Sequence, residues 1–328
     1  KGLACGAAAM PIHAGEVGLK MLWSTASAIG LRRLMSMLPS AYKTTAFYFD
    51  SKSCKGHVGL TIDDGLCRNG PGPSMVAEVE ALLREHGAHC TFFVCSDYLK
   101  GVESEAELLV AGGHELGNHM TSDKHFYFHK LPAAEFERQL REVTAAIEKV
   151  PGVGRVRWFR APQALMTKSM ARGVASQGLQ SVLGDCYADD WAMEHNAEFV
   201  AKTILRQVTD GSVIVLHQPE RGFREHTFAI LRQVLDGLRA KGLKCCTLSE
   251  MARKAGQALP CEHGEGGSAL ARPAAASSPP RHGFVSHAEW APATPFVSHA
   301  NPPSTGAVVE PLSSLQTDEV NVSVQVSR

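Results

Sequence analysis

At Gly59-Leu60-Thr61-Ile62-Asp63-Asp64-Gly65, an apolar run that favours a β-strand ends in two adjacent carboxylates and a glycine. Asp and Gly are common in turns, so taken alone the acidic pair is typical of a turn. In barrel-like α/β folds, however, the carboxyl end of a strand is also where functional side chains gather. The meaning of Asp63 and Asp64 therefore depends on which residues end the other strands of the chain.

Strand-like and helical segments alternate from this stretch onward. The predicted strands are residues 58–62, 90–94, 114–117, 156–160, 180–183, 213–216 and 244–248. Thr167 and Asn196 are predicted to cap two of the intervening helices. The alternation predicts a parallel α/β fold, either a barrel or an open doubly wound sheet. No glycine-rich nucleotide-binding motif follows any strand, which disfavours a nucleotide-binding sheet.

Composition divides the chain into three parts. Residues 1–44 form an N-terminal extension, which is expected to be incomplete because the chain begins with Lys1. This extension is predicted to contain an amphipathic helix that packs on the domain. Residues 45–256 hold the alternating domain, to which residues 45–49 add a short candidate strand. Residues 257–328 are rich in Ala, Ser, Pro and Gly without apolar periodicity, which predicts a low-complexity disordered tail.

Charge and cysteine content narrow the range of partners. The chain has 33 basic and 33 acidic residues, so its net charge does not point to nucleic acid or an anionic membrane surface. The moderately apolar segment 17–38 is interrupted by Lys20, Arg32 and Arg33, which makes it a poor membrane span. The nine cysteines have no regular spacing and do not indicate a disulfide framework. Compartment and oligomeric state are left open.

Polar side chains recur where the later predicted strands end. In chain order they are Asn118 and His119, then Arg160, then Asp185, Asp189 and Asp190, then His217. Because the carboxyl ends of parallel strands meet at one face of a barrel, we expect these side chains to surround Asp63 and Asp64. Five polar strand ends in succession favour a functional site over turn composition.

With these residues in place, the chain resembles the polysaccharide deacetylase family, which is built on the NodB-homology domain, as a divergent member. All five motif regions of that family occur in order over residues 58–255; 61–65 and 214–217 match closely, and the other three are looser. The resemblance implies a distorted (β/α)7-type barrel. It also implies metal-dependent removal of acetyl groups from N-acetylated sugars of the chitin or peptidoglycan kind, by hydrolysis of a C–N bond that is not a peptide bond.

The resemblance further implies a role for each residue. Asp63 would be the catalytic base, which Arg160 and Asp190 would hold and tune, and His217 would be the general acid. Asp64, His119 and Asp123 would bind a divalent metal, with zinc as the expected ion and manganese or cobalt as alternatives. The expected partner is a carbohydrate substrate.

One departure from the family pattern concerns the metal. The second motif of the family has two histidines four residues apart, whereas here His119 is followed at that spacing by Asp123, and the next histidine is His125. We favour Asp123, because it keeps both the spacing and a ligating group; a shifted loop that brings in His125 is the alternative. A degraded site would make the protein a non-catalytic carbohydrate-binding relative. Hydrolysis of acetyl esters, or of another amide or imide, is the remaining alternative.

Overall fold

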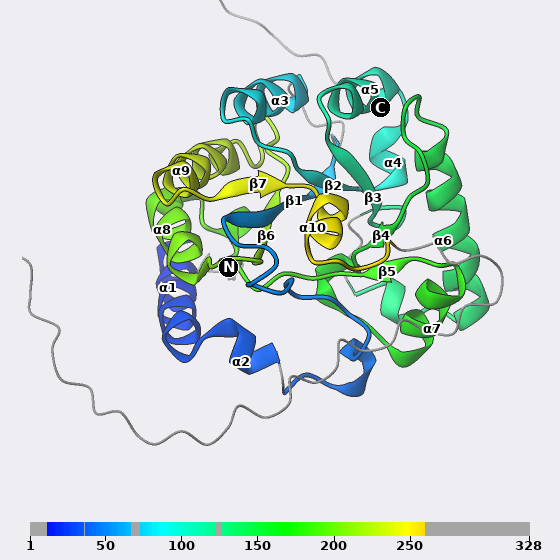
Figure 1. Ribbon diagram of the computed structural model, residues 1–328, viewed down its shortest axis with the longest axis horizontal. Coiled ribbons are helices and arrows are strands. Elements are labelled where there is room, and N and C mark those ends of the chain that lie inside the picture. Colours follow the sequence, from blue (N-terminus) through cyan, green and yellow to red (C-terminus); the bar gives the residue numbers. More distant parts are fainter. Residues whose placement is uncertain (1–11, 36, 67–72, 123–125, 260–328) are drawn as a thin grey trace, which may run out of the picture. The chain divides into compact units, whose positions relative to one another are not determined.

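A curled, all-parallel sheet of seven strands forms the centre of the protein, and helices surround it (Figure 1). This is a computed structural model, and it describes residues 12–35, 37–66, 73–122 and 126–259. The strands are β1 (His57–Gly65), β2 (Thr91–Val94), β3 (Glu115–Asn118), β4 (Trp158–Phe159), β5 (Gln180–Ser181), β6 (Val213–His217) and β7 (Lys244–Cys246). Their order is β5-β4-β3-β2-β1-β6, and β7 pairs with β1. The seven predicted strands and the distorted barrel are therefore confirmed.

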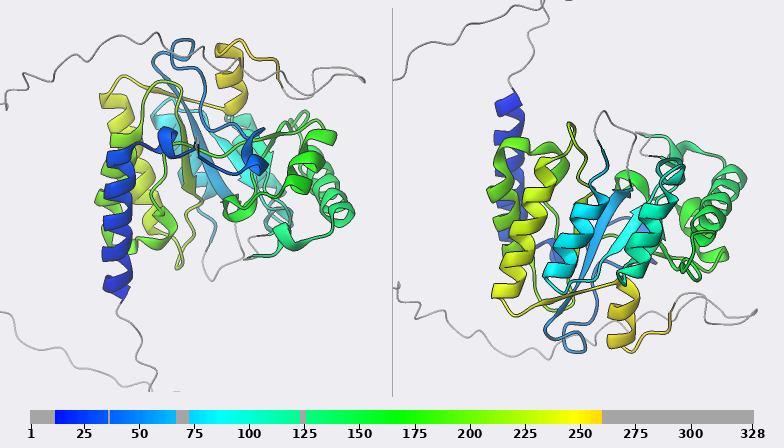
Figure 2. Two further views of the ribbon diagram at one scale, coloured as in Figure 1. Left: turned by 90° about the horizontal axis from the view of Figure 1, so that it is seen from below. Right: turned by 90° about the horizontal axis from the view of Figure 1, so that it is seen from above.

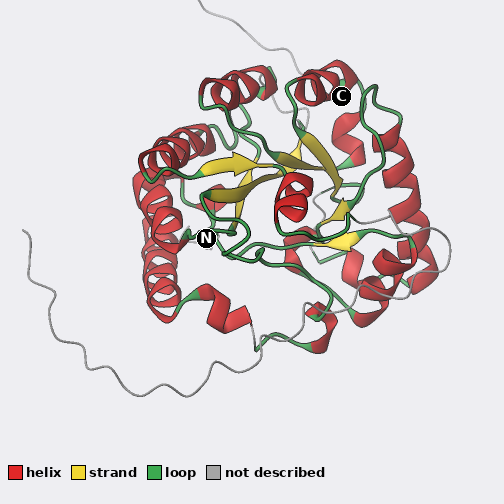
Figure 3. Cartoon of the chain, in the orientation of Figure 1, coloured by secondary structure: helices red, strands yellow, loops and turns green. Residues whose placement is uncertain are grey.

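Helices follow the strands and cover the outside of the sheet (Figure 3). They are α1 (Ile12–Ile29), α2 (Leu31–Met35), α3 (Val76–Glu85), α4 (Ser96–Leu99), α5 (Glu103–Ala111), α6 (Ala133–Glu148), α7 (Lys168–Ser176), α8 (Ala197–Gln207), α9 (His226–Ala240) and α10 (Leu248–Lys254). Thr167 caps α7 as predicted, since its hydroxyl accepts from the Met170 N–H. Asn196 occupies the N-cap position of α8 as predicted, but its side chain makes no capping hydrogen bond, and its amide donates to Glu16 instead. Within the described ranges, no helix is both long and apolar enough to cross a membrane.

β1 is the strand around which the sheet is arranged. Gly59 pairs with Val213 of β6 and with Cys246 of β7 at the same time, so these two strands lie on opposite edges of β1. β2 pairs with the later residues of β1, from Thr61 onward. The register also sets Asp63 directly opposite His217, so two of the predicted site residues end neighbouring strands at the same level.

Strand alternation decides which side chains of β1 enter the barrel. Val58, Leu60 and Ile62 face outward into the core beneath the helices. The residues between them face inward, because successive side chains of a strand point to opposite faces. Thr61 and Asp63 accordingly both reach Arg160 inside the barrel. The inward side chains of β1 are thus the polar ones that bond inside the barrel, while its outward side chains pack in the apolar core.

α10 closes the end of the barrel where the strands begin. Its residues Leu248 and Met251 join Phe93 and Trp158 in a buried apolar cluster, and the Trp158 Nε1–H donates to Ser249 Oγ at 3.0 Å. In Figure 1 this helix lies over the middle of the sheet. Any site inside the barrel must therefore open at the other end, where the strands finish.

β5 and β6 do not pair through a continuous ladder. Isolated bridges join Ala46 to Val182 and Tyr48 to Ser212, and a third joins Cys186 to Ile214. Residues 45–49 were expected to form a strand, and this expectation is wrong. They cross the gap with one parallel and one antiparallel bridge, which is too little contact to make a ladder.

Gly184 lies at this gap, and its replacement by Ala is expected to destabilise the protein. An added Cβ would lie 2.6 Å from the Val213 carbonyl oxygen and against a Val215 methyl, so backbone would have to move. Overpacking of this kind costs about 1–3 kcal/mol. Urea unfolding measures the effect. Gly154→Ala is the matched control, since nothing lies within 4 Å of its added Cβ, and equal midpoints for the two variants would contradict the expectation.

Candidate active site

A buried ion pair joins Asp63 to Arg160 inside the barrel. Arg160 Nη1 lies 2.6 Å from Asp63 Oδ1 and 2.7 Å from Thr61 Oγ1. Its other nitrogens donate to the carbonyls of Val182 and Leu183, and its guanidinium lies 4.2 Å from the Phe93 ring centroid. Arg160 is therefore held from β1, from β2 and from the segment that follows β5, and it fixes the orientation of the Asp63 carboxylate.

Asp64 stays at the site because the backbone departs from regular strand geometry. Simple alternation would turn this side chain outward, away from Asp63. Its φ is instead +59°, in the left-handed region, and the β1–β2 register is irregular between Ile62 and Gly65. Non-glycine residues in this region are uncommon and often mark functional sites. As a result Asp64 Oδ1 lies 3.5 Å from His119 Nε2.

His119 presents a lone pair to that carboxylate. Its Nδ1 lies 2.8 Å from the carbonyl oxygen of Arg160, and because a carbonyl only accepts, Nδ1 must carry the proton. Nε2 is then unprotonated in the neutral ring and faces Asp64. A backbone acceptor on one ring nitrogen is the usual arrangement for a metal-binding histidine. Asp64 and His119 therefore fit a divalent cation as two of its ligands.

The third predicted ligand cannot be placed. Asp123 and the alternative His125 both lie outside the described residues. Within the part of the chain that the structure describes, no group of three His, Cys, Asp or Glu side chains could hold a metal. The fit to a cation accordingly rests on Asp64 and His119.

Arg224 is a site residue that the sequence did not reveal. Its Nη1 lies 2.6 Å from Asp64 Oδ2, and both side chains are buried. The two oxygens of Asp64 are thus divided, with Oδ2 on Arg224 and Oδ1 facing His119. Arg224 lies in the segment between β6 and α9, and neither motif nor spacing singles it out.

Asp190 lies against His217, not against Asp63. Its Oδ1 accepts from His217 Nδ1 and its Oδ2 from the His217 backbone N–H, both at 2.7 Å. Burial by itself would lower the pKa of His217, but the charge and hydrogen bond of Asp190, with smaller contributions from Asp64 and Asp63, raise it to about 9. His226 Nε2 donates to the Asp190 carbonyl at 2.8 Å. His217 is therefore a cation at neutral pH, with its orientation fixed by Asp190.

Comparison with known proteins shows the family of the chain. The sequence profile that describes polysaccharide deacetylases matches residues 50–182. A chitooligosaccharide deacetylase of Azorhizobium caulinodans is 33% identical over 193 residues, which cover 56% of this chain and 88% of that protein. The chain belongs to the polysaccharide deacetylase family.

Solved structures show that the fold is shared with this family. A peptidoglycan N-acetylglucosamine deacetylase superposes with a TM-score of 0.58 at 21% identity, covering 65% of this chain and 96% of that chain. A family 4 acetyl xylan esterase from Clostridium thermocellum, in complex with a cobalt ion, superposes with a TM-score of 0.54 at 25% identity, covering 61% and 92%. The chain therefore shares its fold with both proteins.

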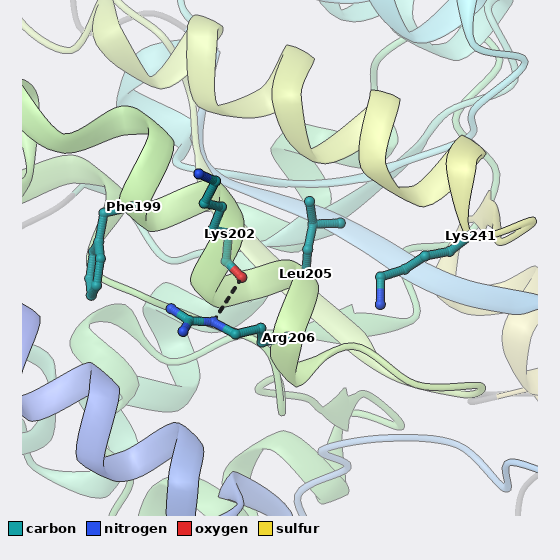
Figure 4. Close-up of a pocket in the computed structure, with 5 residues that line it drawn as sticks. All are labelled: Phe199, Lys202, Leu205, Arg206 and Lys241. Atoms are coloured by element: carbon teal, nitrogen blue, oxygen red, sulfur yellow. Dashed lines mark hydrogen bonds between the residues drawn. The ribbon is translucent and has the colours of Figure 1, made fainter. Parts of the chain in front are cut away.

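A separate surface pocket lies outside this site. Figure 4 shows its lining residues, Phe199, Lys202, Leu205, Arg206 and Lys241. They come from α8 and from the end of α9, and Arg206 Nε donates to the Lys202 carbonyl. None of them contacts the acidic pair or its partners in the described contacts, so the pocket is separate from the candidate active site.

Asp190→Asn is expected to move the basic limb of the deacetylase pH profile. In the wild type kcat/KM should fall as pH rises through about 9, where His217 loses its proton. Without the Asp190 charge, burial lowers the pKa of His217, so the limb should move to lower pH. Acetate release across pH measures this. Asp236→Asn is the matched control, since the Asp236 carboxylate is exposed and pairs with a different histidine, His86; an unmoved limb in Asp190→Asn would contradict the assignment.

Proposed function

We propose that the protein is a metal-dependent hydrolase that removes acetyl groups from N-acetylated sugars of the chitin or peptidoglycan kind. One observation carries the proposal: Asp63 and His217 end neighbouring strands in register, and each is held by a buried ionic partner. An acceptor and a donor of protons are thus carried at the same level by neighbouring strands. The similarity to a chitooligosaccharide deacetylase supports an N-acetylated sugar as the substrate.

The residues divide the reaction between them. Asp63 takes a proton from the water that attacks the acetyl carbon, while Arg160 keeps the carboxylate oriented. His217, a cation at neutral pH, gives its proton to the leaving nitrogen as the C–N bond breaks. The products are acetate and a free amine. Asp190 keeps the imidazole in position on its Nδ1 side, which directs Nε2 toward the substrate.

A divalent cation fits beside these groups. Asp64 Oδ1 and His119 Nε2 would hold it, and Asp123, or His125 in its place, is proposed as the third ligand. When bound, the cation supplies a Lewis acid that polarises the acetyl oxygen. The structure of the family 4 acetyl xylan esterase from Clostridium thermocellum, which shares this fold, is a complex with a cobalt ion, and this supports a metal site here. We propose zinc as the ion. Manganese or cobalt is the alternative, because Asp123 would add a second carboxylate and make the donor set harder.

The test is acetate release from N-acetylglucosamine oligomers by the full-length chain. The protein is stripped with a chelator and reloaded with zinc, manganese or cobalt, and metal content is measured alongside activity. We expect activity only in the reloaded protein, and we expect Asp64→Ala to lose the metal while Asp236→Ala, at an exposed position, retains it. A protein that binds no metal and releases no acetate from any oligomer would rule the proposal out and favour a non-catalytic relative.

Acetyl-ester hydrolysis is the second candidate. It is favoured by the similarity to an acetyl xylan esterase. The two reactions differ in the leaving group, since an amine needs a proton from His217 more strongly than a sugar alcohol does. A panel of acetylxylan and N-acetylglucosamine oligomers separates them. Faster turnover of acetylxylan, with only a small loss in His217→Gln, would favour the ester.

A further inference from the structure

The segment that brings Asp190 to His217 has little regular structure of its own. This acid loop, residues 185–196, connects β5 to α8 and contains only short 3-10 turns, including Asp190–Ala192. Asp190 is fully buried. A loop that must hold a buried carboxylate within hydrogen-bond distance of a catalytic imidazole needs support from neighbouring elements.

That support comes from the N-terminal helices. Arg32 Nε donates to Asp185 Oδ2 at 2.6 Å, and its Nη2 donates to Ser212 Oγ at 3.2 Å. Trp23 Nε1 donates to Asp189 Oδ2 at 2.8 Å. The Glu16 carboxylate, which is buried, accepts from the His195 backbone N–H at 3.2 Å.

A fourth contact is relayed through α8. Gln207 Nε2 donates to Ser27 Oγ at 3.0 Å, and Gln207 Oε1 accepts from the Tyr187 backbone N–H at 2.9 Å. Taken in order, the helix residues 32, 27, 23 and 16 meet the loop residues 185, 187, 189 and 195. The two segments therefore run antiparallel, and the loop is held along its whole length. The two views of Figure 2 show α1 running beside the other helices on the outside of the domain.

Of these contacts, that of Trp23 is linked most directly to His217. Asp189 has a φ of +44°, a left-handed conformation that a side chain must stabilise. Its Oδ1 accepts from the Tyr187 hydroxyl at 2.6 Å, while Trp23 holds Oδ2. The rings of Trp23 and Tyr187 meet edge to face at 5.2 Å, and the ring of Tyr187 lies 6.2 Å from His217.

We infer that α1 and α2 form an N-terminal clasp that sets the position of Asp190 and, through it, of the proposed general acid His217, with Trp23 as a positioning residue. The inference rests on the proposed function for the role of His217. The clasp lies outside residues 50–182, to which the family profile is confined. The site of this chain would then depend on helices that the profile does not include.

The charge state of His217 reports on the clasp. Asp190 bonds to the His217 ring and the ring of Tyr187 lies 6.2 Å from it, while Asp63 and Asp64 of β1 contribute to its pKa only through their charge. Only Asp190 and Tyr187 belong to the loop that the clasp holds. A loosened clasp should therefore weaken the effect of Asp190 on the pKa of His217 and leave the effects of Asp63 and Asp64 unchanged.

The test uses Trp23→Phe in the full chain, which keeps the ring and removes the indole N–H. We expect the NMR-titrated pKa of His217, assigned by comparison with His217→Gln, to fall by about half a unit. We expect kcat to fall roughly threefold to tenfold, the size of one lost hydrogen bond, with KM unchanged. Ser27→Ala should act in the same direction with a smaller effect, and it tests the clasp if Trp23→Phe does not fold.

Met21→Ala is the matched control, because Met21 lies on the exposed face of the same helix. Unchanged pKa and kcat in both Trp23→Phe and Ser27→Ala would overturn the clasp, even in an active deacetylase. A lower His217 pKa in a chain that hydrolyses none of the acetylated substrates would support the clasp and overturn the proposed function instead. A loss of thermal stability alone, with the pKa unmoved, would assign α1 a purely structural role and overturn the inference.

Discussion

Asp63→Asn is expected to lower kcat for deacetylation by about 10²- to 10⁴-fold, the usual contribution of a general base. The amide oxygen of Asn can still accept from Arg160 Nη1, so the side chain should keep its place. It cannot take a proton from the attacking water at neutral pH, however. KM should therefore change much less than kcat, since the loss concerns the transition state and not substrate binding.

Acetate release from N-acetylglucosamine oligomers measures this loss. Asp236→Asn makes the same chemical change in an exposed ion pair, and it should leave kcat unaffected. Metal content should also be retained in Asp63→Asn, because Asp64 and His119 are untouched. Wild-type kcat in Asp63→Asn would remove Asp63 from the role of base.

Arg160→Met should be among the most destabilising single changes in the barrel. The substitution leaves the Asp63 carboxylate buried without its counter-charge, and it removes the donors to Thr61, Val182 and Leu183. Breaking a buried pair from one side costs about 3–5 kcal/mol. Activity should fall as well, because nothing then holds the base in its orientation.

Urea unfolding gives the change in stability, with far-UV circular dichroism as the probe. Arg138→Met is the control, since Arg138 pairs with Glu135 and Glu142 on the exposed face of α6 and exposed pairs contribute little. The double variant Arg160→Met with Asp63→Leu should recover much of the lost stability while remaining inactive. Equal midpoints for Arg160→Met and Arg138→Met would show that the buried pair does not stabilise the fold.

The fold was largely predictable because its signals are local. Each predicted strand is a short apolar run bounded by turn residues, and all seven occur in the structure. Residues 45–49 were misjudged for a physical reason: an aromatic run looks the same in sequence whether it forms a ladder or, as here, two isolated bridges. Asn196 was placed correctly at the N-cap of α8, but its capping bond does not form because Glu16, a distant residue, takes its side chain.

The site was predictable only where side chains follow strand alternation. Asp63 and His217 sit at inward positions at the ends of paired strands, and such positions can be found from sequence. Strand alternation does not tell the three aspartates of the acid loop apart, because each is defined by a distant partner, and only the family resemblance singled out Asp190. Asp185 bonds to Arg32, Asp189 to Trp23 and Asp190 to His217. Arg224 was missed for the same reason.

The position of β7 bears on when the site can form during folding. β7 pairs with the first residues of β1, although most of the domain separates the two strands in sequence. Contacts between segments so far apart slow folding, because the chain must close a long loop before the pairing is gained. During synthesis, β1 lacks this partner until residue 246 has left the ribosome. The strand that carries Asp63 and Asp64 is thus among the first to be made and among the last to be completed. A chain ending before Lys244 would leave an unpaired, aggregation-prone edge at the start of that strand, along His57 to Gly59.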